Sequence, residues 1–372
     1  MRRLVPLFKP VYLPEMGEVA DTVLRSGQIA TGSAVAAFRQ AFGRWIEQDQ
    51  VALTSDMSSA MGIALHLCGV GPGSYVLTPA FACLSTNAPI ANSGATPVWI
   101  DVDPRTGLID PESLQRSITS RSKAVIAYHL AGYPCELESV LAVCREHGLL
   151  LIEDCNNALG ARSGGAPIGA IGDFALYSFY PTRQLNGIEG GALVCKSPDH
   201  ARRAQRLTRF GIDSATFRDA IGEIDPASQI DDIGWSAAMS NLHASVALAQ
   251  MPSLDSRLTQ AREVARDLSQ RIGEIAGVTL VQATPGAVPA HWALLARVQS
   301  ARPLLARLRS VGVQASGLHQ RNDTYLGFRA EQRHLAGTDQ WCESAVGLPC
   351  GWWMNELDTA YVAHALAVAV AA

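Results

Sequence analysis

The segment from Leu149 to Ala192, LLLIEDCNNALGARSGGAPIGAIGDFALYSFYPTRQLNGIEGGA, is the most informative part of the chain. Its opening apolar run stops at the acidic pair Glu153-Asp154, and a second apolar run, 174–179, contains Ser178. Short apolar runs closed by polar residues are typical of buried parallel strands, whose carboxyl ends form the ligand-binding edge of an open α/β sheet. We therefore expect a carboxylate and a hydroxyl at two strand ends of one sheet.

Similar short apolar runs alternate with helical patterns up to about residue 195, which predicts an α/β fold with a large, mostly parallel sheet. Residues 1–50 are expected to form two helices. From about Leu254 a long helical pattern leads into a smaller α+β region, so we predict two domains, 1–253 and 254–372. The other predicted strands lie at 51–54, 75–78, 96–100, 124–129, 278–281 and 293–298, with one more near Val313.

The composition is ordinary for a soluble enzyme, with 48% apolar and 17% charged residues among 372. The net charge of −4 and the lack of a basic block give no electrostatic case for nucleic-acid binding. Eight scattered cysteines without a CxxC pair, no signal peptide and no membrane-length apolar run predict a cytoplasmic protein with reduced thiols. We find no Rossmann fingerprint, P-loop, HExxH or Gly-x-Ser-x-Gly motif, and we expect no metal site.

Three motifs in the first segment keep the order and spacing of a known family. Glu153–Asn157 matches Glu-Asp-x-x-Gln, Ser178–Arg183 matches Ser-Phe-x-x-x-Lys, and Ile188–Gly191 matches Gly-Asp/Glu-Gly-Gly. Over nearly its whole length the chain resembles the DegT/StrS family of sugar aminotransferases. The resemblance implies an aspartate-aminotransferase-like fold with a seven-stranded type of sheet, bound pyridoxal or pyridoxamine phosphate, and a homodimer with shared sites. It also implies a nucleotide-linked or other keto- or amino-sugar substrate in antibiotic or cell-surface sugar biosynthesis.

The resemblance assigns cofactor roles to residues of this chain. Asp154 would hold the pyridinium nitrogen, Asn157 would lie near the ring hydroxyl, and the serines at three positions would face the phosphate. Cys83 stands where the family often has a ring-stacking aromatic, with Phe81 close by as core packing. The phosphate serines are Ser58, Ser59 and Ser178, and Ser236 replaces an asparagine that reaches the neighbouring subunit's phosphate.

Plain structural roles are open for several of these residues. An acidic residue after a strand is often a helix N-cap, which applies to Asp154, and a serine-rich junction such as 55–59 can cap a helix without any ligand. His129, at the end of a predicted strand, is read as a hydrogen-bonded structural histidine. These alternatives do not require a cofactor.

Substrate contacts are expected from two further places. Glu189 either faces the substrate or holds the glycine turn, and the residues alone do not separate these roles. The polar loop 317–324 is similar to His-x-Arg-Asn-Asp loops that border the substrate in some family members. The resemblance therefore assigns His319, Arg321 and Asn322 to substrate binding.

Arg183 occupies the position of the family's Schiff-base lysine. A guanidinium stays protonated and its charge is delocalised, so it cannot replace the lysine amine as a nucleophile. It can bind a carboxylate or phosphate bidentately. Lysine occurs only at Lys9, Lys123 and Lys196, and none is a persuasive substitute.

Three explanations follow for the missing lysine. The leading hypothesis is that the chain is an enzyme that binds the cofactor non-covalently and runs a modified reaction on such a sugar. The alternative is a degenerate homologue that binds a nucleotide sugar or pairs with an active paralogue. The third is that Arg183 was introduced into the natural sequence. Further departures from the family favour natural divergence, and they are Met57, Cys83, Asn157, Ile188, Ser236 and Ala238.

Overall fold

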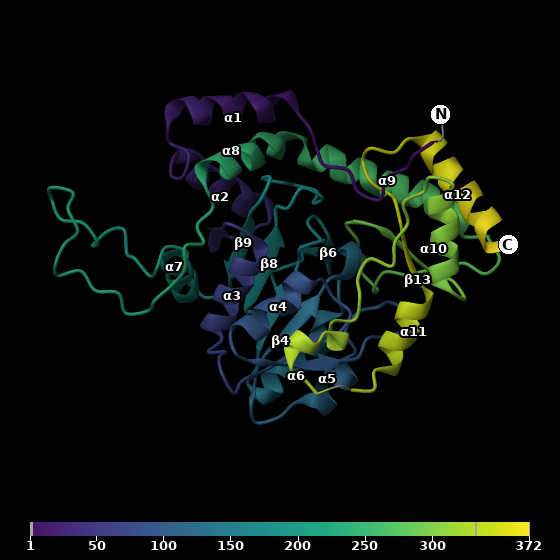
Figure 1. Ribbon diagram of the computed structural model, residues 1–372, viewed down its shortest axis with the longest axis horizontal. Coiled ribbons are helices and arrows are strands. Elements are labelled where there is room, and N and C mark those ends of the chain that lie inside the picture. The colour runs from purple at the N-terminus through teal and green to yellow at the C-terminus, as the bar shows by residue number, and fades with distance from the viewer. Residues whose placement is uncertain (1–2, 332, 372) are drawn as a thin grey trace.

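The structure is a computed structural model that describes residues 3–331 and 333–371. Its centre is a seven-stranded sheet in the order β1-β9-β8-β5-β4-β2-β3 (Figure 1). Strands β2, β3, β4, β5 and β8 run parallel, and β9 runs antiparallel to both of its neighbours. The strands are β1 Val51–Thr54, β2 Tyr75–Pro79, β3 Thr96–Ile100, β4 Ser122–Tyr128, β5 Leu150–Asp154, β8 Phe174–Ser178 and β9 Gly191–Cys195. The predicted α/β class and mostly parallel sheet are confirmed.

Both faces of this sheet are covered, which explains why its strands are apolar at successive positions. On β4, Ala124 and Ile126 pack towards one face and Val125 and Ala127 towards the other. The first face packs against α3 Met57–Leu67, α4 Leu84–Asn92 and α7 Pro198–Leu207, and the second against α5 Pro111–Ser117 and α6 Leu137–His147. Polar residues are therefore left for the strand ends.

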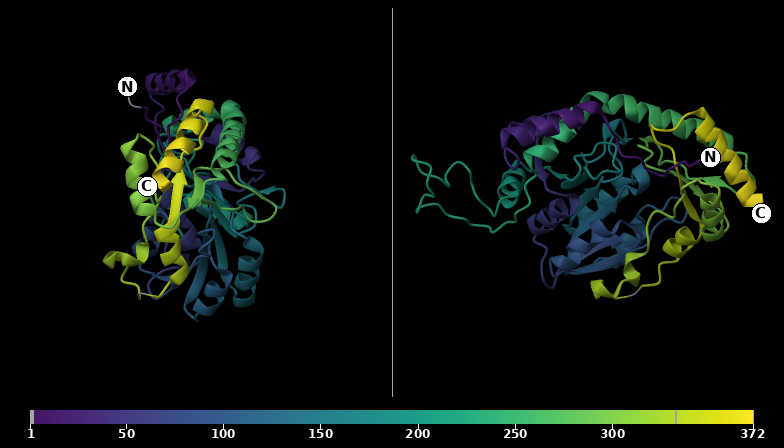
Figure 2. Two further views of the ribbon diagram at one scale, coloured as in Figure 1. Left: turned by 90° about the vertical axis from the view of Figure 1, so that its right-hand side faces the viewer. Right: turned by 45° about the horizontal axis from the view of Figure 1, so that its top comes forward.

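Four further helices, α1 Pro14–Ser26, α2 Ser33–Trp45, α8 Asn241–Gln250 and α9 Leu254–Ile272, lie beside the β1–β9 end of the sheet. Helices α1 and α2 both pack against α8, and α9 continues from α8 towards the C-terminal region (Figures 1 and 2). Phe38 and Phe42 of α2 pack edge-on against Phe179, which follows β8. This aromatic cluster fixes the backbone just before Arg183.

The C-terminal region is built on a smaller antiparallel sheet in the order β10-β12-β13. Its elements are β10 Thr279–Leu280, β12 Leu294–Arg297, α10 Ala301–Ser310, α11 Ala336–Ser344, β13 Ala345–Leu348 and α12 Glu356–Ala371. The run expected near Val313 forms isolated bridges rather than a strand: Val313 pairs with Val5 in parallel, Ser316 pairs with Gly347 of β13, and the Val313 N–H donates to the Leu308 carbonyl at the end of α10. The domain boundary at residue 253 stays a prediction.

A long arm between α7 and α8 projects away from the body, drawn in teal at the left of Figure 1 and again in Figure 2. It contains a short hairpin in which Arg218 pairs with Ile224. A third, minor sheet is formed by β6 Arg162–Ser163, β7 Ala166–Pro167 and β11 Ala287–Val288. Among the described residues, no helix is both long and apolar enough to cross a membrane.

Candidate functional site

Three neighbouring strands bring the candidate residues to one edge of the large sheet. Strand β5 lies between β4 and β8, with Tyr128 in register with Asp154, and Ser178 ends β8. Because these strands are parallel, their last residues meet at the same edge. The carboxylate and the hydroxyl predicted from the sequence are therefore at two strand ends of one sheet.

Asp154 is a fully buried carboxylate. Its Oδ2 accepts a hydrogen bond from Thr86 Oγ1 at 2.6 Å, and its Oδ1 accepts one from the Asn156 N–H at 3.0 Å. Burial raises the pKa of Asp154, although these hydrogen bonds favour the charged form. The Asn156 contact is a local turn, so the side chain is positioned from both its own loop and α4.

Tyr128 places a phenol hydroxyl at the centre of this edge. Asn157 Nδ2 lies 2.5 Å from that hydroxyl, and His319 Nε2 lies 2.8 Å from it. Burial, with the nearby Arg183 charge, lowers the pKa of His319 to about 3. The imidazole is therefore neutral near pH 7, and its Nε2 can accept a hydrogen bond from the Tyr128 hydroxyl. The Asn157 Oδ1, on the same amide, is buried without a hydrogen-bond partner.

Arg183 is a buried cation beside this group, with its side chain only slightly exposed. Its NH1 donates to Thr182 Oγ1 at 3.2 Å, its Nε has no partner, and its guanidinium carbon lies 5.0 Å from the Trp292 ring centre. Trp292 is held in turn by stacking on Phe8 with ring centres 3.8 Å apart. Burial lowers the pKa of Arg183, while Tyr128, Cys83 and Asp154 act in the opposite direction.

The N-terminus of α3 is the place where the cofactor phosphate was expected. The Asp56 carboxylate caps this helix: it accepts from the Ser59 N–H at 2.8 Å, from Ser59 Oγ at 2.6 Å and from Ser55 Oγ at 2.9 Å. Burial acts to raise the pKa of Asp56, but these hydrogen bonds outweigh it and lower the pKa. Ser58 is exposed. The cap is thus an aspartate rather than the serines considered from the sequence.

The structure places the other predicted residues in different surroundings. Arg321 forms ion pairs with Asp323 and Asp339. The buried Asn322 amide accepts a hydrogen bond from Asn87 Nδ2 and donates to the Ala82 and Gln320 carbonyls. Glu189 is exposed, and its partial burial and the nearby Asp56 raise its pKa. Cys83 accepts from Ser85 Oγ at 3.0 Å, Ser178 Oγ accepts from the Tyr180 N–H at 3.3 Å, and Ser236 is exposed in a hollow with Arg39 and Arg209.

None of the three lysines belongs to this group. Lys123 lies near the beginning of β4 and Lys196 follows the end of the antiparallel β9, so both are at the sheet edge opposite Asp154. Lys9 lines a hollow with Trp353 and Asp358. All three are exposed, and the cation beside Asp154 is Arg183.

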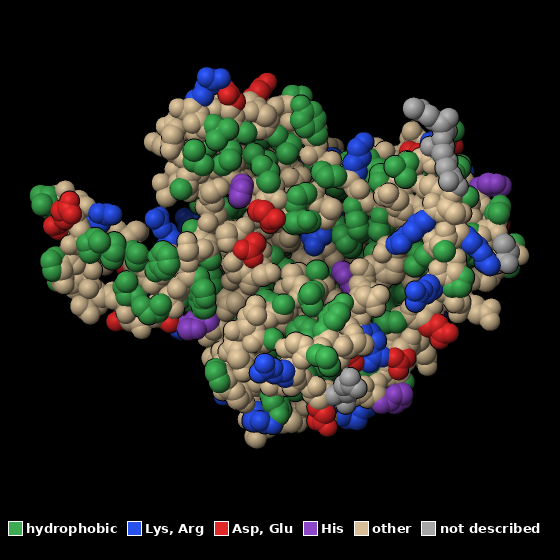
Figure 3. Space-filling model, in the orientation of Figure 1, with side chains coloured by type: hydrophobic (Ala, Val, Ile, Leu, Met, Phe, Trp, Pro, Cys, Tyr) green, Lys and Arg blue, Asp and Glu red, His purple; other side chains and the backbone are tan. Residues whose placement is uncertain are grey.

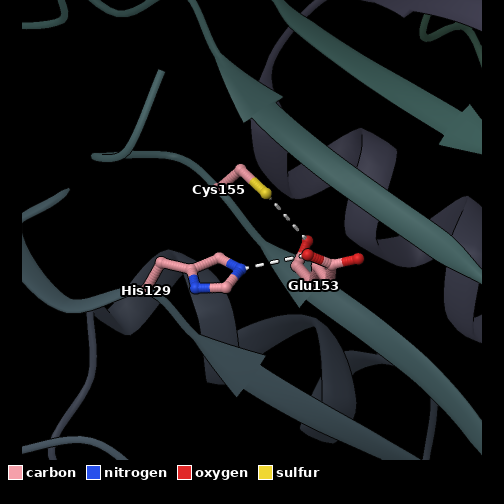
Figure 4. Close-up of side chains that lie close together, drawn as sticks. All are labelled: His129, Glu153 and Cys155. Atoms are coloured by element: carbon pink, nitrogen blue, oxygen red, sulfur yellow. Dashed lines mark hydrogen bonds and ion pairs between the residues drawn. The ribbon is translucent and has the colours of Figure 1, made fainter. Parts of the chain in front are cut away.

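A second buried cluster lies behind the strand ends, and Figure 4 shows its three members, His129, Glu153 and Cys155. Glu153 accepts from His129 Nε2 at 3.2 Å and from the N–H groups of Gly169, Ile171 and Gly172 at 2.6 to 2.9 Å. Burial acts to raise the pKa of Glu153, but these donors outweigh it and hold the pKa below its usual range. The carboxylate fixes the loop before β8, and His129 has the hydrogen-bonded structural role expected for it.

The comparison with known families agrees with this geometry. A model of the DegT/DnrJ/EryC1/StrS aminotransferase family matches residues 14–367. The chain belongs to this family.

Two curated relatives and one solved structure illustrate the family match. The chain is 32% identical to the spore coat polysaccharide biosynthesis protein SpsC of Bacillus subtilis over 288 residues, covering 76% of this chain and 71% of SpsC. It is 30% identical to a pleiotropic regulatory protein of Geobacillus stearothermophilus over 268 residues, 72% of this chain and 69% of that protein. The sugar aminotransferase CalS13 of Micromonospora echinospora superposes with a TM-score of 0.92 at 28% identity, covering 98% of this chain and 100% of CalS13.

Pyridoxal phosphate, the cofactor expected in this family, needs a phosphate seat, a carboxylate on the ring nitrogen, ring contacts and a lysine amine. Asp154 suits the carboxylate role. The other three needs are poorly met, since Asp56 already accepts from the Ser59 N–H of α3, Tyr128 engages the Asn157 amide, and no described lysine lies at this edge. As a set, these residues do not fit the lysine-anchored cofactor.

Three important residues of the site were missed in the sequence. Tyr128 was read only as part of a buried strand, although a phenol hydroxyl inside an apolar run needs a hydrogen-bond partner. Asp56 directly precedes a helix, which is a capping signal that the neighbouring serines obscured. Trp292 gave no local signal, since its contact with Arg183 joins positions far apart in the chain.

Proposed function

We propose that this chain is a sugar-binding member of the family that does not catalyse lysine-dependent aminotransfer and serves as a binding or partner subunit for an active paralogue. The observation that carries this proposal is the buried guanidinium of Arg183 at the position assigned to the lysine, beside Asp154. An arginine cannot supply the amine. The Asp56 cap adds to the argument, because a carboxylate at the α3 N-terminus opposes a second anion there.

The proposed ligand is a nucleotide-linked or other keto- or amino-sugar used in cell-surface or antibiotic sugar biosynthesis. This part rests on relatives, since SpsC is named for spore coat polysaccharide biosynthesis and CalS13 for sugar aminotransfer. The polar groups at the sheet edge and the partly exposed Tyr180, Trp292 and His319 offer hydrogen-bonding and stacking surfaces of the kind that bind sugars.

A second candidate is an enzyme that holds pyridoxal or pyridoxamine phosphate non-covalently and acts on such a sugar. Two observations favour it: Asp154 lies at the end of β5, and Asn157 Oδ1 is buried without a partner, which leaves one acceptor for a ligand or water. When bound, the cofactor would supply an electron sink next to the amino or keto carbon of the sugar. In this chain Asp154 would hold its ring nitrogen.

Equilibrium titration separates the two candidates. The full-length protein is titrated with pyridoxal phosphate and with pyridoxamine phosphate, and a lysine-bearing family member serves as the positive control. We expect no saturable binding of either cofactor form, together with saturable binding of a nucleotide sugar by calorimetry. Saturable cofactor binding with conversion of one form to the other by an amino donor would overturn the first candidate in favour of the second.

We also infer a homodimer with shared sites. Ser236 is exposed next to the projecting arm, in a hollow with Arg39 and Arg209, and the arm itself carries large apolar side chains into solvent. Such apolar exposure is typical of an interaction surface. A second copy of the chain is the partner that the family resemblance favours.

A further inference from the structure

The Arg183 guanidinium has an incomplete set of partners. A buried cation is unfavourable unless hydrogen bonds and a counter-charge compensate for lost hydration. Arg183 is 8% exposed, its Nε donates to no described atom, and its described side-chain hydrogen bond goes to the neutral Thr182 hydroxyl. The guanidinium therefore has N–H groups that remain free to donate hydrogen bonds to a ligand.

The groups around the guanidinium supply little negative charge. Burial raises the pKa of Tyr128 and lowers that of His319, so both are neutral near pH 7. Burial also raises the pKa of Asp154, and that carboxylate is already hydrogen-bonded by Thr86 and Asn156. Of the groups that act most strongly on the Arg183 charge, Asp154 is the carboxylate. It also accepts hydrogen bonds from Thr86 and Asn156.

The guanidinium is also close to the surface. Thr182, Trp292 and His319 are partly exposed, and Tyr180 is 48% exposed. On the face drawn in Figure 3, acidic, basic and histidine side chains lie close together near the centre. The partly exposed side chains next to Arg183 therefore give a small ligand group a way to approach the guanidinium from the surface.

We propose that Arg183 binds an oxyanion of the sugar ligand, a carboxylate or a phosphate group that enters beside Tyr180, Trp292 and His319. The planar guanidinium presents paired N–H donors that match either oxyanion. The guanidinium carbon lies over the Trp292 ring, 5.0 Å from its centre, and the Trp292 Nε1–H donates to the Thr182 carbonyl at 2.9 Å. This inference rests on the proposed sugar-binding function and specifies an acidic ligand for it.

Calorimetry with two matched sugars tests the inference. UDP-glucuronic acid and UDP-glucose differ by a carboxylate in place of a hydroxymethyl group, so their affinities for the full-length protein isolate the carboxylate contact. We expect UDP-glucuronic acid to bind about 10- to 100-fold more tightly, the usual range for hydrogen bonds to a charged group. Arg183→Gln should remove the difference, Arg183→Lys should keep part of it, and Arg145→Gln, at an exposed arginine on α6, should leave it unchanged.

Each outcome has one meaning. If Arg183→Gln weakens both sugars and inorganic phosphate by the same factor, the oxyanion is a phosphate and the inference stands in that form. If both sugars bind wild type equally and Arg183→Gln changes neither affinity, the inference is overturned while sugar binding stands. If neither sugar binds wild type, the proposed sugar-binding function is not supported for these ligands and the Arg183 contact has no sugar to hold. Circular dichroism checks that each variant is folded, and if Arg183→Gln fails to fold, the affinities of Arg183→Lys carry the test.

Discussion

The Tyr128 hydroxyl lies 2.8 Å from His319 Nε2 and so joins the end of β4 to a loop of the C-terminal region. Because burial lowers the pKa of His319, its imidazole is neutral near pH 7, and Nε2 in its unprotonated form accepts a hydrogen bond from the phenol. The same hydroxyl is 2.5 Å from Asn157 Nδ2, so an amide, a phenol and an imidazole form one chain of hydrogen bonds. In this protein the edge of the sheet is therefore filled by its own side chains.

This contact predicts a loss of stability in mild acid. The pKa of His319 falls from 6.5 to about 3 on folding, chiefly through burial, so its contribution is fully present above about pH 6.5 and is lost as pH falls towards 3. We expect the urea midpoint of wild type to fall between about pH 7 and pH 5, and that of His319→Gln to fall less steeply. His364→Gln, on the exposed side of α12, is the matched control and should keep the wild-type slope. Equal slopes for wild type and His319→Gln would contradict the prediction.

Much of the fold could be predicted from local patterns. The apolar runs predicted six of the seven strands of the large sheet to within about two residues, because strands buried on both faces leave a continuous signal; the antiparallel β9 was given no bounds. The third strand of the small sheet, β13, was missed because Ala345–Leu348 is short and contains a glycine. The run near Val313 forms isolated bridges, from Val313 to Val5 and from Ser316 to Gly347, rather than a strand.

The site could be predicted only in part, for a different reason. Asp154 and Arg183 were singled out because a family motif fixes their spacing along the chain; the structure places them near one another, and their roles stay predictions. The surroundings of Arg183 depend on Trp292 and His319, which come from distant segments and carry no local mark. The spacing of the motif therefore predicts which residues belong to the site, but it does not predict the side chains, such as Trp292 and His319, that pack around them.

The Asp56 cap predicts a matched pair of stability effects. Asp56→Ala removes the acceptor for the Ser59 N–H and should lower the free energy of unfolding by about 1 kcal/mol. Asp56→Asn keeps a capping oxygen and should stay near wild type. Urea unfolding followed by circular dichroism measures both. Equal losses in the two variants would show that charge, rather than the cap, determines the effect.

The filled edge predicts that restoring the lysine alone is insufficient. Arg183→Lys supplies an amine, but Tyr128 still engages Asn157 and Asp56 still caps α3. We expect pyridoxal phosphate, fixed by borohydride and detected by mass spectrometry, to label this variant at background level. The triple variant Arg183→Lys, Tyr128→Phe, Asp56→Asn should be labelled specifically at residue 183. Strong labelling of the single variant would show that the pocket is open, and would favour the second candidate function.

The Glu153 cluster predicts a large, localised stability loss. Glu153→Gln replaces a buried carboxylate that accepts from His129 and three backbone N–H groups, and it should cost about 3 kcal/mol. Glu146→Gln, exposed on α6, is the control and should change the free energy of unfolding by less than about 0.5 kcal/mol. Hydrogen exchange should show faster exchange in residues 169–172 of Glu153→Gln. Unchanged protection there would argue against the role of Glu153 in fixing this loop.

The projecting arm predicts the oligomeric state. Ile221 and Ile224, at its hairpin, are 84% and 57% exposed. Burying such apolar side chains against a partner is favourable, so their exposure is typical of an interaction surface. If a second copy covers them, the double variant Ile221→Asp, Ile224→Asp should dissociate a wild-type dimer and raise its dissociation constant at least about 10-fold. Sedimentation velocity over a range of concentrations measures this, with Leu326→Asp, at an 89% exposed leucine away from the arm, as the control. A wild-type protein that sediments as a monomer, or a double variant that dimerises as well as the control, would remove the arm from the interface.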